Sequence, residues 1–108
     1  MHYIFFVIDQ QSNTADSDEM AAIDVFNQAL QDNGQWVLAA GIAAPALATV
    51  VDNRDDAAVI NTGSIFDADD FYCGFWIVEA ASDEEALTLA SAGSKACNRR
   101  VEVRPFLR

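Results

Sequence analysis

The chain has 108 residues, of which 52% are hydrophobic and 10% aromatic, a composition typical of one globular domain over residues 1–108 and not of a disordered chain. Seventeen acidic against six basic residues give a net charge of −11, which repels phosphate backbones and disfavours nucleic acid as a partner. The longest apolar runs are as long as strands and far shorter than the roughly 20 residues that span a bilayer, so no membrane segment is predicted.

The N-terminal residues, the cysteines and the single histidine predict a cytoplasmic protein without a metal site. The N-terminus lacks the basic region and apolar core of a signal peptide. Cys73 and Cys97 have no C-x-x-C spacing, which predicts reduced, buried thiols. With His2 as the only histidine, ligands for a transition metal are too few, and neither a metal nor a cofactor is predicted.

Basic residues are absent from residues 1–53 and gather at the C-terminus. Such a strip could pair with acids inside a dimer or receive an anionic ligand, and an ordinary solvated edge is the favoured interpretation. The residues concerned are Arg99, Arg100, Arg104 and Arg108.

The first third of the chain predicts a strand and a helix. Residues 2–9 are apolar on both faces, which predicts a central strand. Asp16 or Ser17 then begins a helix, since Glu19 stands three residues after Asp16 in capping-box position. The helix ends at residues 33–34, and its apolar stripe consists of Ile23, Phe26 and Leu30.

The middle of the chain predicts a strand, a hairpin and a loop. Residues 36–40 form a short strand, followed by a bend at residues 41–45 that Gly and Pro interrupt. Residues 48–51 and 57–61 predict two strands of a hairpin around a charged tip. Residues 62–70 form a polar loop before the next strand.

Residues 72–80 are apolar at nearly every position and predict a second central strand. Strict alternation places Cys73 with Phe75 and Ile77 on one face, and Tyr72 with Trp76 and Val78 on the other. A second helix then begins at Ser82, with Glu85 in capping-box position, and is expected to end at Gly93. Residues 101–106 form the last strand, and Pro105 suits a sheet edge.

This order, βαβ, an inserted hairpin and βαβ, predicts an α+β ferredoxin-like fold. Its antiparallel sheet has the first and third main strands in the middle. Two helices cover only one face of such a sheet, while large apolar side chains remain on the other. A homodimer that stacks sheet on sheet is therefore predicted.

Several of these stretches together resemble the YCII-related family, and the DGPF-domain branch most closely. They are residues 3–6, the glycines at 34 and 41, residues 74–80 with the acidic helix start that follows, and residues 101–106. The resemblance covers nearly the whole chain and implies a dimeric α+β-barrel-type fold. It also implies a regulatory partner, because such proteins are often encoded beside alternative sigma factors.

The chain departs from the family pattern where the family's chemistry lies. The Asp-Gly-Pro-Phe loop of the branch corresponds to residues 62–65, which keep only the glycine. Family members with a proposed active site use a first-helix His together with an Asp, and this chain has Ile23 followed by Asp24 at that place. An alkyl side chain cannot transfer a proton, and Asp24 lies off the apolar stripe, where a solvated role is favoured.

The remaining polar residues give weak candidates for a ligand site. Asn27 at the helix margin could reach a pocket over the sheet, and a glycine between two hydroxyl residues allows close backbone approach. The acids at 67, 69 and 70 lack the Gly and the distant Glu of a calcium loop. Tyr72 and Trp76 could line the same pocket, but are favoured as dimer-interface anchors. The ligand-binding candidates are Asn27, Thr62, Gly63 and Ser64, and the weak catalytic candidate is Asp24.

Two functions follow. The preferred one is a cytoplasmic homodimer that serves as a small-molecule-binding or interaction module without the family's dyad. The alternative, which the resemblance allows, is a small-molecule enzyme such as a lyase or dehydrochlorinase. It would use Asp24, Asn27, Thr62 and Ser64 in a cleft between the sheet and the first helix.

Overall fold

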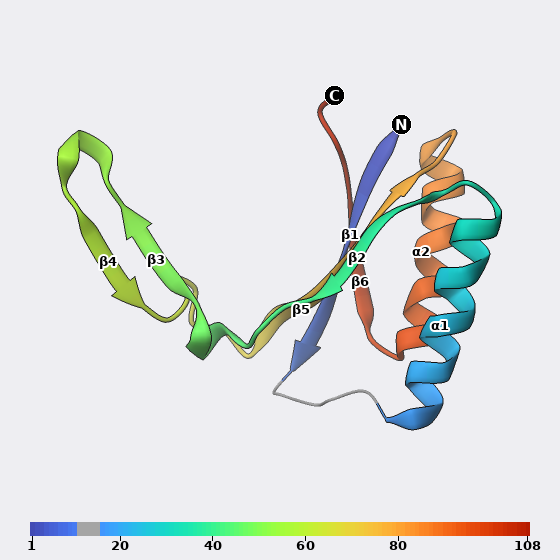
Figure 1. The fold of residues 1–108 in the computed structure, drawn as a ribbon, viewed down its shortest axis with the longest axis horizontal. Helices are drawn as coiled ribbons and strands as arrows, with labels where there is room; N and C mark the ends of the chain where they lie inside the picture. The colour runs from blue at the N-terminus through green and yellow to red at the C-terminus, as the bar shows by residue number, and fades with distance from the viewer. Residues whose placement is uncertain (11–15) are drawn as a thin grey trace.

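The computed structural model describes residues 1–10 and 16–108, and its main body is a four-stranded antiparallel sheet with two helices on one face (Figure 1). The strand order is β2-β5-β1-β6, so the first and third main strands lie in the middle, as predicted for a ferredoxin-like fold. The elements of the body are β1 (His2–Gln10), α1 (Ser17–Asp32), β2 (Trp36–Gly41), β5 (Asp70–Glu79), α2 (Asp83–Cys97) and β6 (Arg100–Pro105).

The inserted hairpin stands apart from this body. β3 (Thr49–Asp52) pairs only with β4 (Val59–Thr62), and the two-stranded arm that they form projects away from the helices (Figure 1). One short 3-10 turn, Pro45–Leu47, precedes β3, and another, Arg54–Asp56, forms the tip. A two-stranded hairpin is marginally stable on its own, and this one keeps Val51 and Ile60 largely exposed.

The core lies between the sheet and the helices. Tyr3, Phe5 and Val78 are fully buried there, and the Phe26 ring meets the Trp76 ring edge to face with centroids 5.1 Å apart. Each such side chain contributes about 1.5–3 kcal/mol when fully buried. Neither helix in the described part of the chain is both long and apolar enough to cross a bilayer.

Capping residues set where each helix begins. Asp16 accepts the Glu19 backbone N–H at 2.8 Å, and the Glu19 carboxylate accepts the Asp16 N–H, which confirms the predicted capping box. Ser82 caps α2 by accepting the Glu85 N–H at 3.1 Å. The Glu85 carboxylate, however, accepts from the Ala81 N–H and not from Ser82.

The prediction that α2 ends at Gly93 is wrong. The helix continues to Cys97, and Asn98 terminates it in the left-handed conformation with φ 53°. Gly93 is instead a packing residue, since a Cβ at this position would lie 3.2 Å from the Phe26 ring. Its missing side chain lets α2 approach α1 and the sheet closely.

A β-bulge in β5 changes which face its first residues occupy. Val7 pairs with Gly74 and Ile8 with Tyr72, so Cys73 is the extra residue. Tyr72 therefore lies on the open face, where its ring stacks on Phe6 with centroids 4.2 Å apart. The alternation predicted for Tyr72 and Cys73 is wrong for this reason.

The face of the sheet away from the helices remains uncovered in the single chain. Its central side chains are apolar and partly exposed, and at one side Arg104 donates to Glu102 at 2.7 Å and to the Tyr72 hydroxyl at 3.0 Å. The apolar residues of this open face are Ile4, Phe6, Ile8, Phe75 and Ile77.

Candidate functional site

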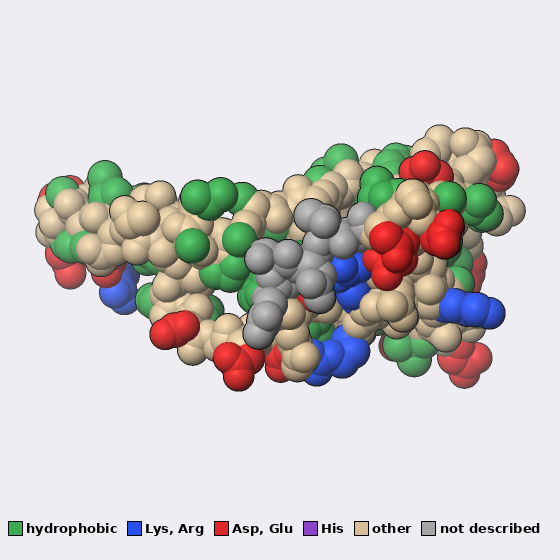
Figure 2. All heavy atoms as spheres, turned by 90° about the horizontal axis from the view of Figure 1, so that it is seen from below, with side chains coloured by type: hydrophobic (Ala, Val, Ile, Leu, Met, Phe, Trp, Pro, Cys, Tyr) green, Lys and Arg blue, Asp and Glu red, His purple; other side chains and the backbone are tan. Residues whose placement is uncertain are grey.

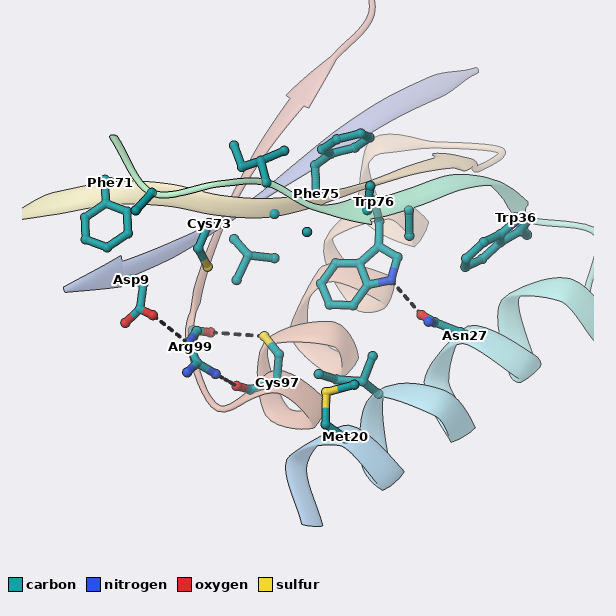
Figure 3. A pocket seen from close by; sticks show the side chains of 18 residues that line it. Asp9, Met20, Asn27, Trp36, Phe71, Cys73, Phe75, Trp76, Cys97 and Arg99 are labelled. Atoms are coloured by element: carbon teal, nitrogen blue, oxygen red, sulfur yellow. Dashed lines mark hydrogen bonds and ion pairs between the residues drawn. The ribbon is translucent and has the colours of Figure 1, made fainter. Parts of the chain in front are cut away.

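A cavity of about 630 Å³ lies between the helix-facing side of the sheet and α1 (Figure 3). This volume is within the range of pockets that hold small organic molecules. Its walls are mostly aliphatic and aromatic, and both tryptophans of the chain take part. The large apolar side chains around it are Val7, Met20, Ile23, Trp36, Phe71 and Trp76.

Close pairing of β2 with β5 shapes the sheet side of this cavity. Gly74 in β5 is opposite Gly41 in β2, and both line the cavity. A Cβ on Gly74 would lie 3.0 Å from the Ala40 carbonyl oxygen, a backbone atom that cannot move aside. Glycine at position 74 therefore allows β2 to pair with β5 at the normal spacing of a β-sheet.

One polar point of the cavity is the Asn27 amide on α1. The Trp76 indole N–H donates to Asn27 Oδ1 at 2.7 Å (Figure 3). This bond satisfies the buried indole and fixes the orientation of the amide. The Asn27 amino group is therefore the part that can donate to a bound molecule.

The other polar point is a charged cluster that joins β1, α1 and the turn between α2 and β6. Arg99 Nε lies 3.2 Å from Asp9 Oδ2, and its guanidinium reaches Glu19 Oε2 at 3.3 Å and donates to the Cys97 carbonyl at 2.9 Å. Burial by itself would lower the pKa of Arg99, but its hydrogen bonds and charge pairs with Asp9 and Glu19 raise it. The guanidinium is therefore charged and held by its own chain. We name Asp9, Glu19 and Arg99 the charged cluster.

Two thiols complete the lining near the charged cluster (Figure 3). Cys97 is buried, and the bulge brings Cys73 to the helix-facing side. Burial is the main cause that raises the pKa of both thiols. Both are therefore protonated at neutral pH, a form that is a poor nucleophile.

Of the candidates from the sequence, the structure brings only Asn27 and Trp76 to the cavity. Asp24 is exposed on α1. Thr62, Gly63 and Ser64 stand at the base of the arm and do not line the cavity. Their polar groups serve the turn: the backbone N–H of Gly63 donates to Ala48, and that of Ser64 to Pro45. The three residues are therefore not grouped with Asn27.

The two suggested interface anchors lie on opposite faces of the sheet. Trp76 is 4% exposed and packs inside its own chain, so it offers no area to a second copy. Its place in the core corrects the prediction of an interface role. Tyr72 is partly exposed on the open face, where it donates to Glu102 at 2.6 Å.

Sequence reasoning missed Asp9, and it gave Arg99 only as part of the C-terminal basic strip, favoured as a solvated edge, whereas the Arg99 side chain is 12% exposed and paired with Asp9. A signal for Asp9 was present: the buried face of β1 reads Tyr3, Phe5, Val7 and then Asp9, so an acid continues an apolar row. Its partner is 90 positions away in the chain, and no local pattern connects the two. In the ranges 1–10 and 16–108, no three His, Cys, Asp or Glu side chains are grouped to hold a metal ion.

Comparisons with family models and with solved structures each found a match. The family model described as the YCII-related domain matches residues 1–107. Among solved structures, the chain is similar to 5-chloro-2-hydroxyhydroquinone dehydrochlorinase from Burkholderia phenoliruptrix in complex with 2,5-dihydroxybenzoquinone. That likeness has 15% identity and a TM-score of 0.49, and it covers 98% of this chain and 93% of the other. No curated protein matches the sequence.

Proposed function

Because the chain belongs to the YCII-related family and carries this cavity, we propose that it binds a small, mostly apolar organic molecule between the sheet and α1. The observation that carries the proposal is the cavity of about 630 Å³ with aromatic walls and two polar points. Ligand pockets combine a large apolar lining with a few polar groups that orient the ligand. Two thiols outside any disulfide fit a protein of the reducing cytoplasm.

The residues around the cavity support binding more than proton transfer. Ile23 lies in the wall, at the place where the family resemblance puts a histidine. Asp9 is held by Arg99 at 3.2 Å, and the two thiols are protonated. Ile23 has no ionisable group, Asp9 is ion-paired and the thiols are protonated, so none of these groups is the free base that general acid–base catalysis requires.

Intrinsic fluorescence gives a direct test, since both tryptophans line the cavity. Small aromatic probes such as phenol and indole derivatives should quench or shift this fluorescence saturably and raise the melting temperature. Ala39→Phe fills the cavity and should abolish the response, while Ala43→Phe, at an exposed position outside the lining, should keep it. Equal responses from the two variants would contradict the proposal.

We also propose that the working form is a homodimer. The open face carries a row of partly exposed apolar side chains, and the arm exposes more, seen as the side chains coloured green along it in Figure 2. An apolar surface of this extent on a small domain is typical of an interface. A second copy that stacks its own open face here would cover both sheets at once. The exposed residues of the arm region are Leu47, Val51, Ile60, Ile65 and Phe66.

The dimer is tested by a charge placed in the middle of the open face. Ile77→Glu should convert the protein to a monomer in sedimentation velocity, because a buried unpaired carboxylate is costly. Val25→Glu, at a 72% exposed position on α1, is the matched control and should leave the mass unchanged. A wild-type protein that sediments as a monomer at micromolar concentration would refute the dimer.

The alternative function is a small-molecule enzyme of the lyase or dehydrochlorinase type. One observation favours it: the Asp9 carboxylate and two thiols face the cavity. In that case Asp9 would receive the proton, since Asp24, Thr62 and Ser64 lie elsewhere. Chloride release from chlorinated hydroquinones by the wild type, and none by Asp9→Asn, would favour the enzyme over the binding module.

A further inference from the structure

The charged cluster has an imbalance that bears on what the cavity accepts. Two carboxylates, Asp9 and Glu19, surround one guanidinium, that of Arg99, at 3.2 and 3.3 Å. The side chains of Asp9 and Arg99 are 9% and 12% exposed, and that of Glu19 is 22% exposed. Solvent therefore screens this group of charges far less than it screens a surface pair.

No further charged side chain among the described lining residues of the cavity offsets this excess. Among the described residues that line it, Asp9 and Arg99 are the only charged ones, and both lining thiols are neutral because burial raises their pKa. Residues 11–15 contain no ionisable side chain in their sequence. The lining by itself is therefore balanced, and the net negative charge of the charged cluster comes from Glu19, which contacts Arg99 from outside the lining.

We propose that this cavity selects cationic or neutral aromatic ligands, with organic amines preferred, and rejects carboxylates and other anions. The inference rests on the proposed ligand-binding function and assigns its ligand class. Arg99 is already bound by two carboxylates of its own chain, so an anion would have to compete with them and approach Asp9 closely. An ammonium group gains from the same carboxylates.

The walls favour the same class of ligand. Trp36, Phe71 and Trp76 present aromatic rings to the cavity, and the face of an aromatic ring attracts a cation within about 6 Å. Asn27, with its carbonyl oxygen occupied by Trp76, can donate a hydrogen bond to an acceptor on the ligand. A molecule with an amine at one end and an acceptor at the other matches both polar points.

Three probes of equal shape test the charge preference: 4-tert-butylbenzylamine, 4-tert-butylbenzyl alcohol and 4-tert-butylbenzoate. Calorimetry at a physiological ionic strength of about 0.15 M screens the field of the acidic surface. We expect the amine to bind most tightly, the alcohol next, and the benzoate at least about 10-fold more weakly than the amine, as expected for a like charge in a weakly screened site.

Matched variants assign the preference to the cluster. Glu19→Gln removes the excess charge and keeps the helix cap, since Gln serves in a capping box as Glu does. It should reduce the ratio of amine to benzoate affinity about 10-fold, that is, close to parity. Glu84→Gln, an exposed acid on α2, makes the same change in net charge and should leave the ratio unaltered.

The possible results separate the inference from the function on which it rests. Benzoate that binds as tightly as the amine overturns the charge preference and leaves the binding function intact. Binding of the amine that survives Ala39→Phe lies outside the cavity and also overturns the preference. If none of the three probes binds, both the proposed function and this inference are overturned.

Discussion

The buried contact between Asp9 and Arg99 provides a sharp test of how the domain is stabilised. Arg99→Met keeps much of the side-chain volume but leaves Asp9, 8% exposed, without its guanidinium partner. Removing one partner of a buried ion pair costs about 3–5 kcal/mol, against a total unfolding free energy of about 5–15 kcal/mol. We expect a loss near the lower limit, about 3 kcal/mol, because the Gln10 N–H still donates to Asp9 Oδ1 at 2.8 Å.

Urea unfolding at pH 7 and one fixed protein concentration measures this loss, since the apparent stability of a dimer depends on concentration. Arg100→Met is the matched control: its side chain is 61% exposed, and its pair with Asp70 should contribute less than about 1 kcal/mol. The double variant Asp9→Asn/Arg99→Met should regain most of the stability, because the most buried carboxylate is gone and Glu19, 22% exposed, keeps solvent and the Asp16 N–H as partners. If Arg99→Met loses no more than Arg100→Met, the reasoning from burial is refuted.

Two further predictions concern packing and pH. Gly93→Val should destabilise the fold by about 1–3 kcal/mol, because its Cβ would lie 3.2 Å from the Phe26 ring. The control Ala92→Val, on the exposed side of α2, should cost about 0.5 kcal/mol. Equal losses of the two variants in thermal unfolding would contradict the packing role of Gly93. Tyr3 donates to Asp83 at 2.6 Å, and this hydrogen bond, with burial, raises the pKa of Tyr3 to about 12 from an ordinary 10.0. The fold stabilises the protonated phenol, so the contribution of Tyr3 to the free energy of unfolding is complete below pH 10 and is lost as the pH rises toward 12. Asp83→Asn should lower the titration midpoint of Tyr3, measured by carbon-13 NMR of the ring. An unchanged midpoint would argue against this hydrogen bond.

Local patterns in the sequence predicted the elements and their order correctly. Asp16 and Glu19 marked the start of α1 because a capping box depends on residues three positions apart. Apolar side chains on both faces identified β1 and β5 as the central strands, since such strands must be covered on both faces. Pro105 indicated an edge because it has no N–H to donate to a further strand.

Errors arose where a position serves a contact with a distant element. A glycine near the end of a helical pattern usually marks the end of the helix, yet Gly93 lies inside α2 and packs against Phe26. The bulge inserts Cys73 as an extra, unpaired residue in β5, and the apolar sequence gives no sign of it, so strict alternation placed Tyr72 on the wrong face. Trp76, apolar with a polar N–H, fits an interface and a core equally well until Asn27 is found 2.7 Å away.

The sequence by itself determined the fold class of this protein, because periodicity, caps and turn residues act over a few positions and are visible along the chain. Only the tertiary structure decided where a ligand could bind. The cavity exists because α1 rests on the sheet beside the start of β6, and its charged cluster joins Asp9, Glu19 and Arg99 from three separate elements. Such a site depends on side chains meeting across 80 to 90 positions, and no spacing in one sequence records that distance.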